Sequence, residues 1–359
     1  MLRTQRSRVG WTCLAVTLLA GGCSDRPQML VETIDEPHPC LADVSTARGE
    51  LLQDDTVNEP SHSTDVTLET YDLAPQSTDI AIDDWLEAHY VAIDPSVSPR
   101  HQLFLFFGGS HGQPSQQQLI VQQAARLGMH AINLRYPNAW TVGELCRRSR
   151  DENCHAKVRL EILEGTNHSD LVEVTRPNSI ANRLVKLLRY LHEQNPEQGW
   201  SSYLQGDAVQ WGAIVVAGHS QGGGHAALIG KHHPVAKVVM LAAPADYSRT
   251  LKTPAPWLAQ PGVTPPERYY GFVHTQDPGS DRIQQAWQLL RMAPQEAPTY
   301  VDTQVPPYNC AHQLITAADP AIRGKFHGSV ATDRTTPKLP DGTPLFQDVW
   351  QYLMLAEPE

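Results

Sequence analysis

The chain has 359 residues, 28 prolines and a formal net charge of −11 at pH 7. The acidic balance and the lack of Lys/Arg clusters argue against nucleic acid or an anionic membrane surface as a partner. After the leader and tether described next, about 300 residues remain, enough for one large α/β domain with a substantial core.

Residues 1–22 have the features of an export signal. Arginines precede the apolar stretch 11–20, which is too short to span a bilayer because a spanning helix needs about 20 residues. Small residues then lead to Cys23, a pattern that resembles a bacterial lipobox and implies a lipid anchor on that thiol. Ser24 resembles an outer-membrane sorting signal, so we expect an exported protein anchored at the outer membrane or cell surface. The alternative is an ordinary signal peptide and a periplasmic or secreted product.

Residues 23–65 are predicted to form a tether, because acidic residues and prolines are scattered there with little apolar periodicity. Beyond the signal and anchor, the chain has an even number of cysteines, which fits an oxidising compartment: Cys40, Cys146, Cys154 and Cys310. Cys146 and Cys154 bracket a short polar loop, so we expect them to pair, and Cys40 would then pair with Cys310. The other two connectivities remain open. Zinc is a weak competitor, because no C-x-x-C spacing occurs.

From residue 66 to the end, predicted strands alternate with predicted helices. Strands are expected over 66–71, 89–93, 102–107, 130–135, 213–217, 236–241, 268–274 and 313–316. Helices are expected over 114–127, 178–194, 221–232, 281–292 and 345–355. A polar insertion at about 138–177, with a short helix near 157–163, interrupts the alternation. This pattern predicts a mostly parallel sheet with helices on both faces.

The most informative segment is Gly218-His-Ser-Gln-Gly222, which lies between a β-branched apolar run and a helical pattern. A serine on a strained strand-to-helix turn exposes its hydroxyl, and flanking glycines allow the close approach that the turn needs. The helix N-terminus would then face the oxyanion of an acyl-transfer reaction. A Gly-rich packing turn, with Ser220 as a simple helix cap, is the alternative interpretation.

A second Gly-rich turn, Phe107-Gly-Gly-Ser-His-Gly112, follows an earlier buried strand. Together with the serine turn it resembles the α/β-hydrolase superfamily, over roughly residues 66–359. The resemblance implies the α/β-hydrolase fold and a serine esterase or lipase-like activity on a small-molecule or lipid ester, with no metal or organic cofactor. It also implies oxyanion N–H donors at Gln221 and in the Gly109–Ser110 region.

In that superfamily the chain order is serine, acid, histidine, each after a strand. Asp277 follows a predicted strand in the usual position of the acid, with Asp246 and Asp319 as alternatives. His327 lies beyond the last predicted strand and is the expected base. The predicted catalytic residues are therefore Ser220, Asp277 and His327.

The substrate pocket is less well defined. His111, His219 and Trp257 are tentative lining residues, although His111 could equally be a solvated loop residue and Trp257 a packed core residue. Only residues 248–267 stand where many relatives insert a cap, so the 138–177 insertion could partially cover the site instead. A peptidase or an acyltransferase would use the same triad, and a non-catalytic surface lipoprotein of this fold is a further alternative. The sequence predicts neither the natural ester nor the oligomeric state.

Overall fold

The computed structural model describes residue 40 and residues 68–292 and 297–357, all of which belong to a unit spanning Pro37–Glu359. The predicted leader, Cys23 and the predicted tether other than Cys40 lie outside the described residues. Within the described part, no helix is both long and apolar enough to cross a membrane.

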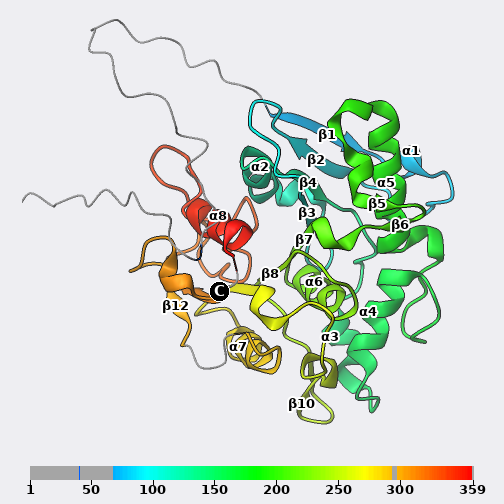
Figure 1. The fold of residues 1–359 in the computed structure, drawn as a ribbon. Coiled ribbons are helices and arrows are strands. Elements are labelled where there is room, and N and C mark those ends of the chain that lie inside the picture. The colour runs from blue at the N-terminus through cyan, green and yellow to red at the C-terminus, as the bar shows by residue number, and fades with distance from the viewer. Residues whose placement is uncertain (1–39, 41–67, 293–296, 358–359) are drawn as a thin grey trace, which may run out of the picture. The chain divides into compact units, whose positions relative to one another are not determined.

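Nine of the described strands form the central sheet (Figure 1). In spatial order they are β1 (Glu69–Leu73), β2 (His89–Ile93), β4 (His130–Asn133), β3 (Leu103–Phe107), β7 (Ile214–His219), β8 (Lys237–Leu241), β11 (Tyr269–His274), β13 (Gln313–Thr316) and β12 (Thr299–Tyr300). The pairs β1–β2 and β2–β4 are antiparallel, and every other neighbouring pair is parallel. Every residue of β3, β7, β8 and β11 is buried. Both faces of these strands are covered, which explains why they read as continuous apolar runs.

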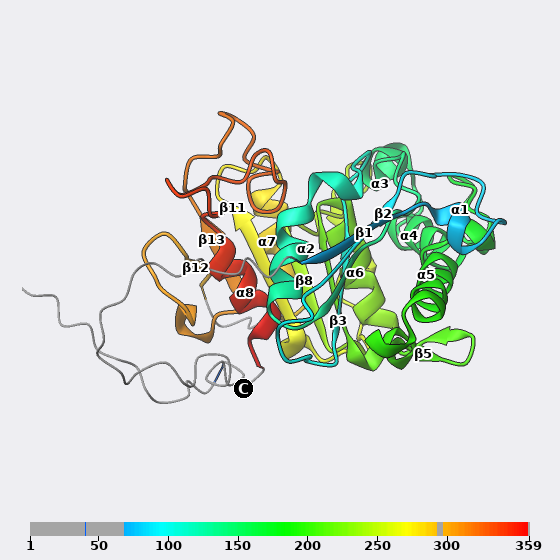
Figure 2. The same ribbon diagram turned by 90° about the horizontal axis from the view of Figure 1, so that it is seen from above.

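Helices cover both faces of this sheet (Figures 1 and 2). On one face, α2 (Gln118–Arg126) packs against α8 (Gln347–Leu355), whereas α6 (Gln221–His232) covers the other face. The helix α4 (Cys154–Glu164) contacts both α6 and α5 (Ile180–Gln194), and α7 (Ser280–Leu289) packs against β11. The expected doubly covered, mostly parallel sheet is confirmed.

Some predicted elements differ from the structure in their boundaries. The helix expected over 114–127 is a 3₁₀ turn, Pro114–Gln116, followed by α2, because Gln117 has a non-helical backbone (φ −140°, ψ 54°). The insertion contains the short α3 (Val142–Leu145) and an α4 that is longer than predicted. The chain also has a short α1 (Pro75–Thr78) and two-residue strands that no periodicity could indicate: β5 (Leu204–Gln205), β6 (Ala208–Val209), β9 (Tyr247–Ser248), β10 (Thr253–Pro254) and β12.

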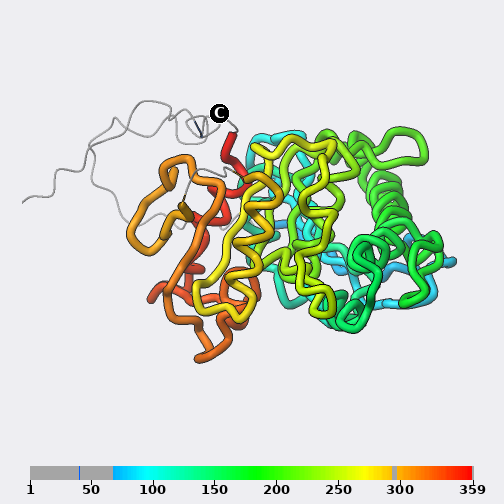
Figure 3. Tube along the Cα trace, turned by 90° about the horizontal axis from the view of Figure 1, so that it is seen from below, coloured from blue at the N-terminus to red at the C-terminus, as the bar shows by residue number. Residues whose placement is uncertain are grey.

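Among the described residues there are two disulfides, and both have the pairing that the sequence favours. Cys146–Cys154 connects the end of α3 to the start of α4 within the insertion. Cys40–Cys310 attaches the chain before β1 to the turn that precedes β13. In Figure 3 the insertion (green) and the segment after β13 (orange) lie on opposite sides of the central strands. The serine turn at the end of β7 is therefore approached by two different parts of the chain.

Candidate active site

Ser220 occupies a strained turn between β7 and α6. Its backbone dihedral angles are φ 55° and ψ −119°, and α6 begins at the next residue. A positive φ is costly for a residue with a side chain and is typical of a nucleophile elbow. The flanking glycines are required by contact: a Cβ on Gly222 would lie 2.0 Å from the carbonyl oxygen of Phe107, and one on Gly218 would lie 2.3 Å from the carbonyl carbon of Gly222.

The structure brings Asp277 and His327 into contact. His327 Nδ1 lies 2.6 Å from Asp277 Oδ2, and Gly279 N–H donates to Asp277 Oδ1 at 2.7 Å. Burial raises the pKa of Asp277, but the hydrogen bond and charge of His327 outweigh it, so this pKa lies below its ordinary value. The His327 side chain is 45% exposed and that of Asp277 only 2%. The ionised acid is therefore enclosed, while the imidazole remains accessible.

His219 connects the elbow to the histidine segment. Its Nε2 lies 2.8 Å from the carbonyl oxygen of His327, and the two imidazole rings are 4.9 Å apart between centroids. A carbonyl oxygen only accepts, so His219 Nε2 carries the proton and donates it. Burial lowers the pKa of His219 to about 3, which keeps the ring neutral. Because His219 directly precedes Ser220, this bond places His327 beside the elbow.

The other two candidate acids have different surroundings. Asp246 is buried and forms a bidentate ion pair with Arg159, at 2.8 and 2.7 Å. Burial raises the pKa of Asp246, but the Arg159 guanidinium outweighs it and holds this pKa well below its ordinary range. Asp319 is exposed on the segment after β13. Trp257, a tentative pocket residue, is buried and donates its indole N–H to Asp246 Oδ2 at 3.0 Å, which fits the packed alternative.

The predicted oxyanion donors lie next to the serine. A Cβ on Gly109 would be 3.2 Å from Ser220 Cβ, and Ser110 Oγ donates to Gln221 Oε1 at 2.9 Å. Within the described part of the chain, the backbone N–H groups of Ser110 and Gln221 have no hydrogen-bond acceptor. The tentative pocket residue His111 is exposed, with φ 59°. Two backbone donors are thus available where a tetrahedral oxyanion would form.

The insertion packs directly against the elbow, at the residue that follows Ser220. Val142 N–H, at the start of α3, donates to Gln221 Oε1 at 3.0 Å. Arg159 Nη1, on α4, donates to the Gln221 carbonyl at 2.9 Å. A Cβ on Gly224 would lie 2.2 Å from the Arg159 guanidinium. The run of three glycines after Gln221 was the available signal, because its last member makes room for a buried cation.

Residues 40, 68–292 and 297–357 include no group of three or more His, Cys, Asp or Glu side chains that could hold a metal ion. The chemistry that the described groups can perform is acyl transfer. They offer a hydroxyl on a strained turn, an imidazole held by a buried carboxylate, and two unpaired N–H donors.

The sheet, the helices on its two faces and the strained serine turn after β7 define the α/β-hydrolase fold. A scan against protein-family models found no match, and a search of curated proteins found no relative. Among solved structures, the chain is similar to a bacterial heroin esterase at 17% identity and TM-score 0.33, over 75% of this chain and 78% of the esterase.

Two further solved structures are similar at a comparable level. One is a hyperthermophilic esterase from the archaeon Pyrobaculum calidifontis, with 13% identity and TM-score 0.38 over 82% of this chain and 84% of that chain. The other is an S-formylglutathione hydrolase from Agrobacterium tumefaciens, with 12% identity and TM-score 0.33 over 63% of this chain and 81% of that chain. Because these scores are low, the fold assignment depends on the sheet and the serine turn of this chain.

Proposed function

We propose that the protein is a serine hydrolase that cleaves carboxylic esters through an acyl-enzyme. The observation that carries this proposal is the 2.6 Å contact between His327 and the buried Asp277, formed beside a serine with a left-handed backbone. Ser220 is the proposed nucleophile, His327 the base and Asp277 the residue that orients the base.

In the proposed reaction, His327 Nδ1–H donates a hydrogen bond to Asp277, which leaves the Nε2 lone pair free to act as a base. Ser220 Oγ forms a bond to the ester carbonyl carbon while its proton passes to Nε2. The oxyanion is stabilised by the N–H of Gln221 and one from the Gly109–Ser110 region. The carbon–alkoxide bond then breaks, and the alcohol leaves with the proton from Nε2. Water repeats the sequence on the acyl-enzyme and releases the acid.

The test is hydrolysis of p-nitrophenyl esters of increasing acyl length by a soluble form beginning at residue 24. Ser220→Ala should abolish turnover and labelling by a fluorophosphonate. Ser202→Ala is the matched control, because that serine is exposed on a distant 3₁₀ turn, and it should behave as wild type. Turnover that survives Ser220→Ala would contradict the serine mechanism. If the wild-type protein neither turns over any ester nor is labelled, the serine-hydrolase proposal fails and the non-catalytic alternative takes its place.

The same residues would serve a peptidase or an acyltransferase, and substrates separate these activities. A peptidase would cleave peptide p-nitroanilides as well as esters, whereas an esterase would leave the anilides intact. An acyltransferase would yield a new ester when an alcohol is added, with less free acid. We expect ester hydrolysis to dominate both comparisons.

We further propose that the protein is exported and anchored through a lipid on Cys23. The lipobox-like sequence supports this proposal, and the two disulfides fit an oxidising compartment. Radiolabelled palmitate fed to expressing bacteria should label the wild-type protein, whereas Cys23→Ser should remain unlabelled and leave the membrane fraction. Equal membrane retention of both proteins would contradict the anchor.

A further inference from the structure

The turn after β3 is held by the residues that follow β4, in a pattern that the triad does not account for. Tyr136 Oη donates to the carbonyl of Gly108 at 2.7 Å. Asn138 Nδ2 donates to the carbonyls of Gly109 and Gly112, at 2.8 and 2.9 Å. The backbone carbonyl of Asn138 accepts from the N–H of His111 at 2.7 Å. A single buried asparagine therefore makes three hydrogen bonds to one short turn.

The direction of these carbonyls fixes the direction of the neighbouring N–H groups. In a trans peptide the C=O of one residue and the N–H of the next point in opposite directions. Because the Gly109 carbonyl points at Asn138, the Ser110 N–H points away from Asn138. On that other side the Ser110 hydroxyl bonds the Gln221 side chain, next to Ser220. The N–H of this peptide is therefore directed to the side of the turn on which Gln221 and Ser220 lie.

We propose that Asn138 is a positioning residue for catalysis, which aims the Ser110 N–H at the oxyanion by holding the Gly109 carbonyl. The inference rests on the proposed acyl-transfer function, and it selects Ser110 as the second donor beside Gln221. Asn138 itself does not touch the substrate.

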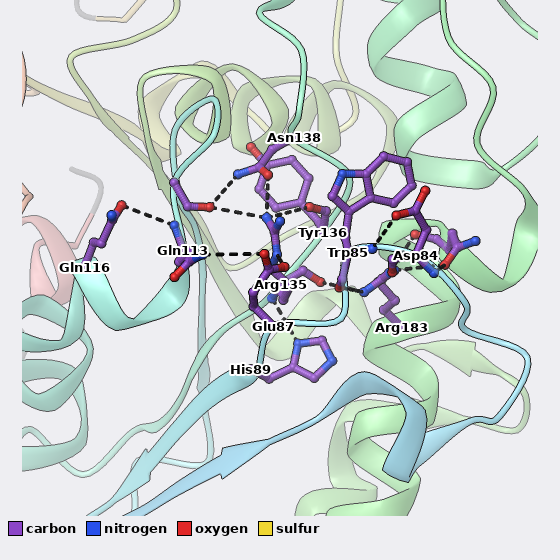
Figure 4. Close-up of polar contacts among 12 residues, drawn as sticks. Asp84, Trp85, Glu87, His89, Gln113, Gln116, Arg135, Tyr136, Asn138 and Arg183 are labelled. Carbon is purple, nitrogen blue, oxygen red and sulfur yellow. Dashed lines mark hydrogen bonds and ion pairs between the residues drawn. The ribbon is translucent and has the colours of Figure 1, made fainter.

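An ion pair between the buried Arg135 and the exposed Glu87 orients the Asn138 amide (Figure 4). Arg135 Nη1 donates to Asn138 Oδ1, and Arg135 Nε bonds Glu87 Oε2 at 2.7 Å. A guanidinium only donates, so the Asn138 oxygen must face Arg135 and its nitrogen must face the turn. Arg135 also donates to the Gly112 carbonyl at 3.3 Å. The amide cannot rotate without losing these bonds.

The experiment compares Asn138→Asp and Asn138→Ala with wild type on an oxygen ester and on its thiono analogue. Asp keeps the size but removes the N–H donor that holds two carbonyls. We expect kcat on the oxygen ester to fall about 10- to 100-fold with KM little changed, because a misaimed donor loses transition-state stabilisation. A thiono ester develops its charge on sulfur, a weaker acceptor in a longer bond. Its rate should therefore change by less than about 3-fold.

Asn133→Asp is the matched control. Asn133 is also buried, lies at the end of β4, and donates to two carbonyls, those of Pro114 at 3.1 Å and Gln117 at 3.5 Å. It is expected to cost stability and leave the oxygen-to-thiono rate ratio unchanged. All rates are expressed per active site titrated with a fluorophosphonate, so unfolded protein does not contribute. Asn138→Ser, which keeps one small donor, should show an intermediate ratio and provides a milder variant if the others fold poorly.

Equal losses on both esters, or wild-type kcat in the Asn138 variants, would overturn the positioning role. A change of the ratio in Asn133→Asp as large as in Asn138→Asp would also overturn it. Failure of the proposed function is distinguishable, because it would appear in the wild-type protein as the absence of Ser220-dependent turnover, and it would remove this proposal as well.

Discussion

Two loops reach Ser220, and they are held in different ways. The oxyanion turn, residues 108–112, follows β3, the strand next to β7, and is fixed by contacts with Tyr136 and Asn138, which follow β4. The base segment, residues 317–346, follows β13, three strands from β7 on the other side. Apart from one bridge between Lys338 and Pro344, it contains no helix or strand.

The base segment is held instead by contacts from distant elements. His219 donates to the carbonyl of His327. Asp333 accepts the N–H groups of Gln118 and Leu119 at the start of α2, at 2.9 and 3.2 Å. Trp350, on α8, donates to the carbonyl of Val330 at 2.9 Å. The oxyanion N–H donor of residues 108–112 thus depends on one short turn, whereas the position of His327 depends on several separate contacts. A single substitution among these contacts should therefore disturb the oxyanion turn more than the base segment.

The largest effect is expected on the base side, from Asp277→Asn. Because the Gly279 N–H holds the oxygen of the variant amide, the amide NH2 faces Nδ1 and favours the wrong imidazole tautomer, so kcat should fall by about 10⁴-fold. Ester turnover measured at saturating substrate checks this. Asp319→Asn, at an exposed carboxylate after β13, is the matched control and should retain full activity. Loss of activity in Asp319→Asn, with activity retained in Asp277→Asn, would reassign the acid.

The next largest effect is expected from the buried ion pair between Arg159 and Asp246, which packs against Gln221. Arg159→Met should destabilise the fold by about 3–5 kcal/mol, because it leaves the buried Asp246 without its partner. The double variant Arg159→Met/Asp246→Leu should recover most of this loss, since no buried charge remains. Urea unfolding followed by circular dichroism measures both. An Arg159→Met protein as stable as wild type would show that the Asp246 carboxylate is stabilised without the charge of Arg159.

The same ion pair predicts a dependence of stability on pH. Since the folded-state pKa of Asp246 is depressed, its contribution is present above the unfolded value of about 3.9 and is lost as the pH falls below that value. Unfolding free energies measured between pH 7 and 3 should therefore fall less steeply in the double variant than in wild type. Parallel pH dependences in wild type and the double variant would show that the pKa of Asp246 is not depressed in the folded protein.

A smaller effect is expected at the oxyanion turn itself. In Gly109→Ala the new Cβ would lie 3.2 Å from Ser220 Cβ, tighter than ordinary contact. The turn or the serine must shift, and kcat should fall by about 10²-fold, the size of one lost oxyanion donor. Gly143→Ala is the control, because a Cβ there meets nothing within 4 Å. Equal kcat values for the two variants would show that the turn absorbs the extra methyl group.

The sequence predicts the local parts of this site better than the assembled ones. The strand, elbow and helix around Ser220 follow from periodicity and glycine spacing, and the chain order placed Asp277 and His327, which the structure shows in contact. Asn138 and Arg159 were missed. Each lies far from the elbow in sequence and acts through backbone carbonyls, which any donor could satisfy. The types of these two residues therefore carry no signal. For Arg159 the glycine run after Gln221 was an indirect one, and the packing of the insertion reveals both residues.

The smallest effect should come from His219, which attaches the base segment to the elbow. His219→Phe keeps a planar ring but removes the N–H that bonds the His327 carbonyl. Loss of one neutral hydrogen bond costs about 1 kcal/mol, so kcat should fall by only about 5- to 10-fold, because Asp333 and Trp350 still hold the segment. His219→Asn, whose amide can donate, should recover part of that loss.

The pH profile separates this attachment from a catalytic role for His219. Because the pKa of His219 is about 3, the ring stays neutral and the bond stays intact throughout pH 5–9. The profile of kcat should then have the same shape in wild type, His219→Phe and His219→Asn, with only its height reduced. A shifted or lost inflection in the variants would mean that His219 itself exchanges protons with the substrate. The base side would in that case hold two active imidazoles rather than one imidazole and its anchor.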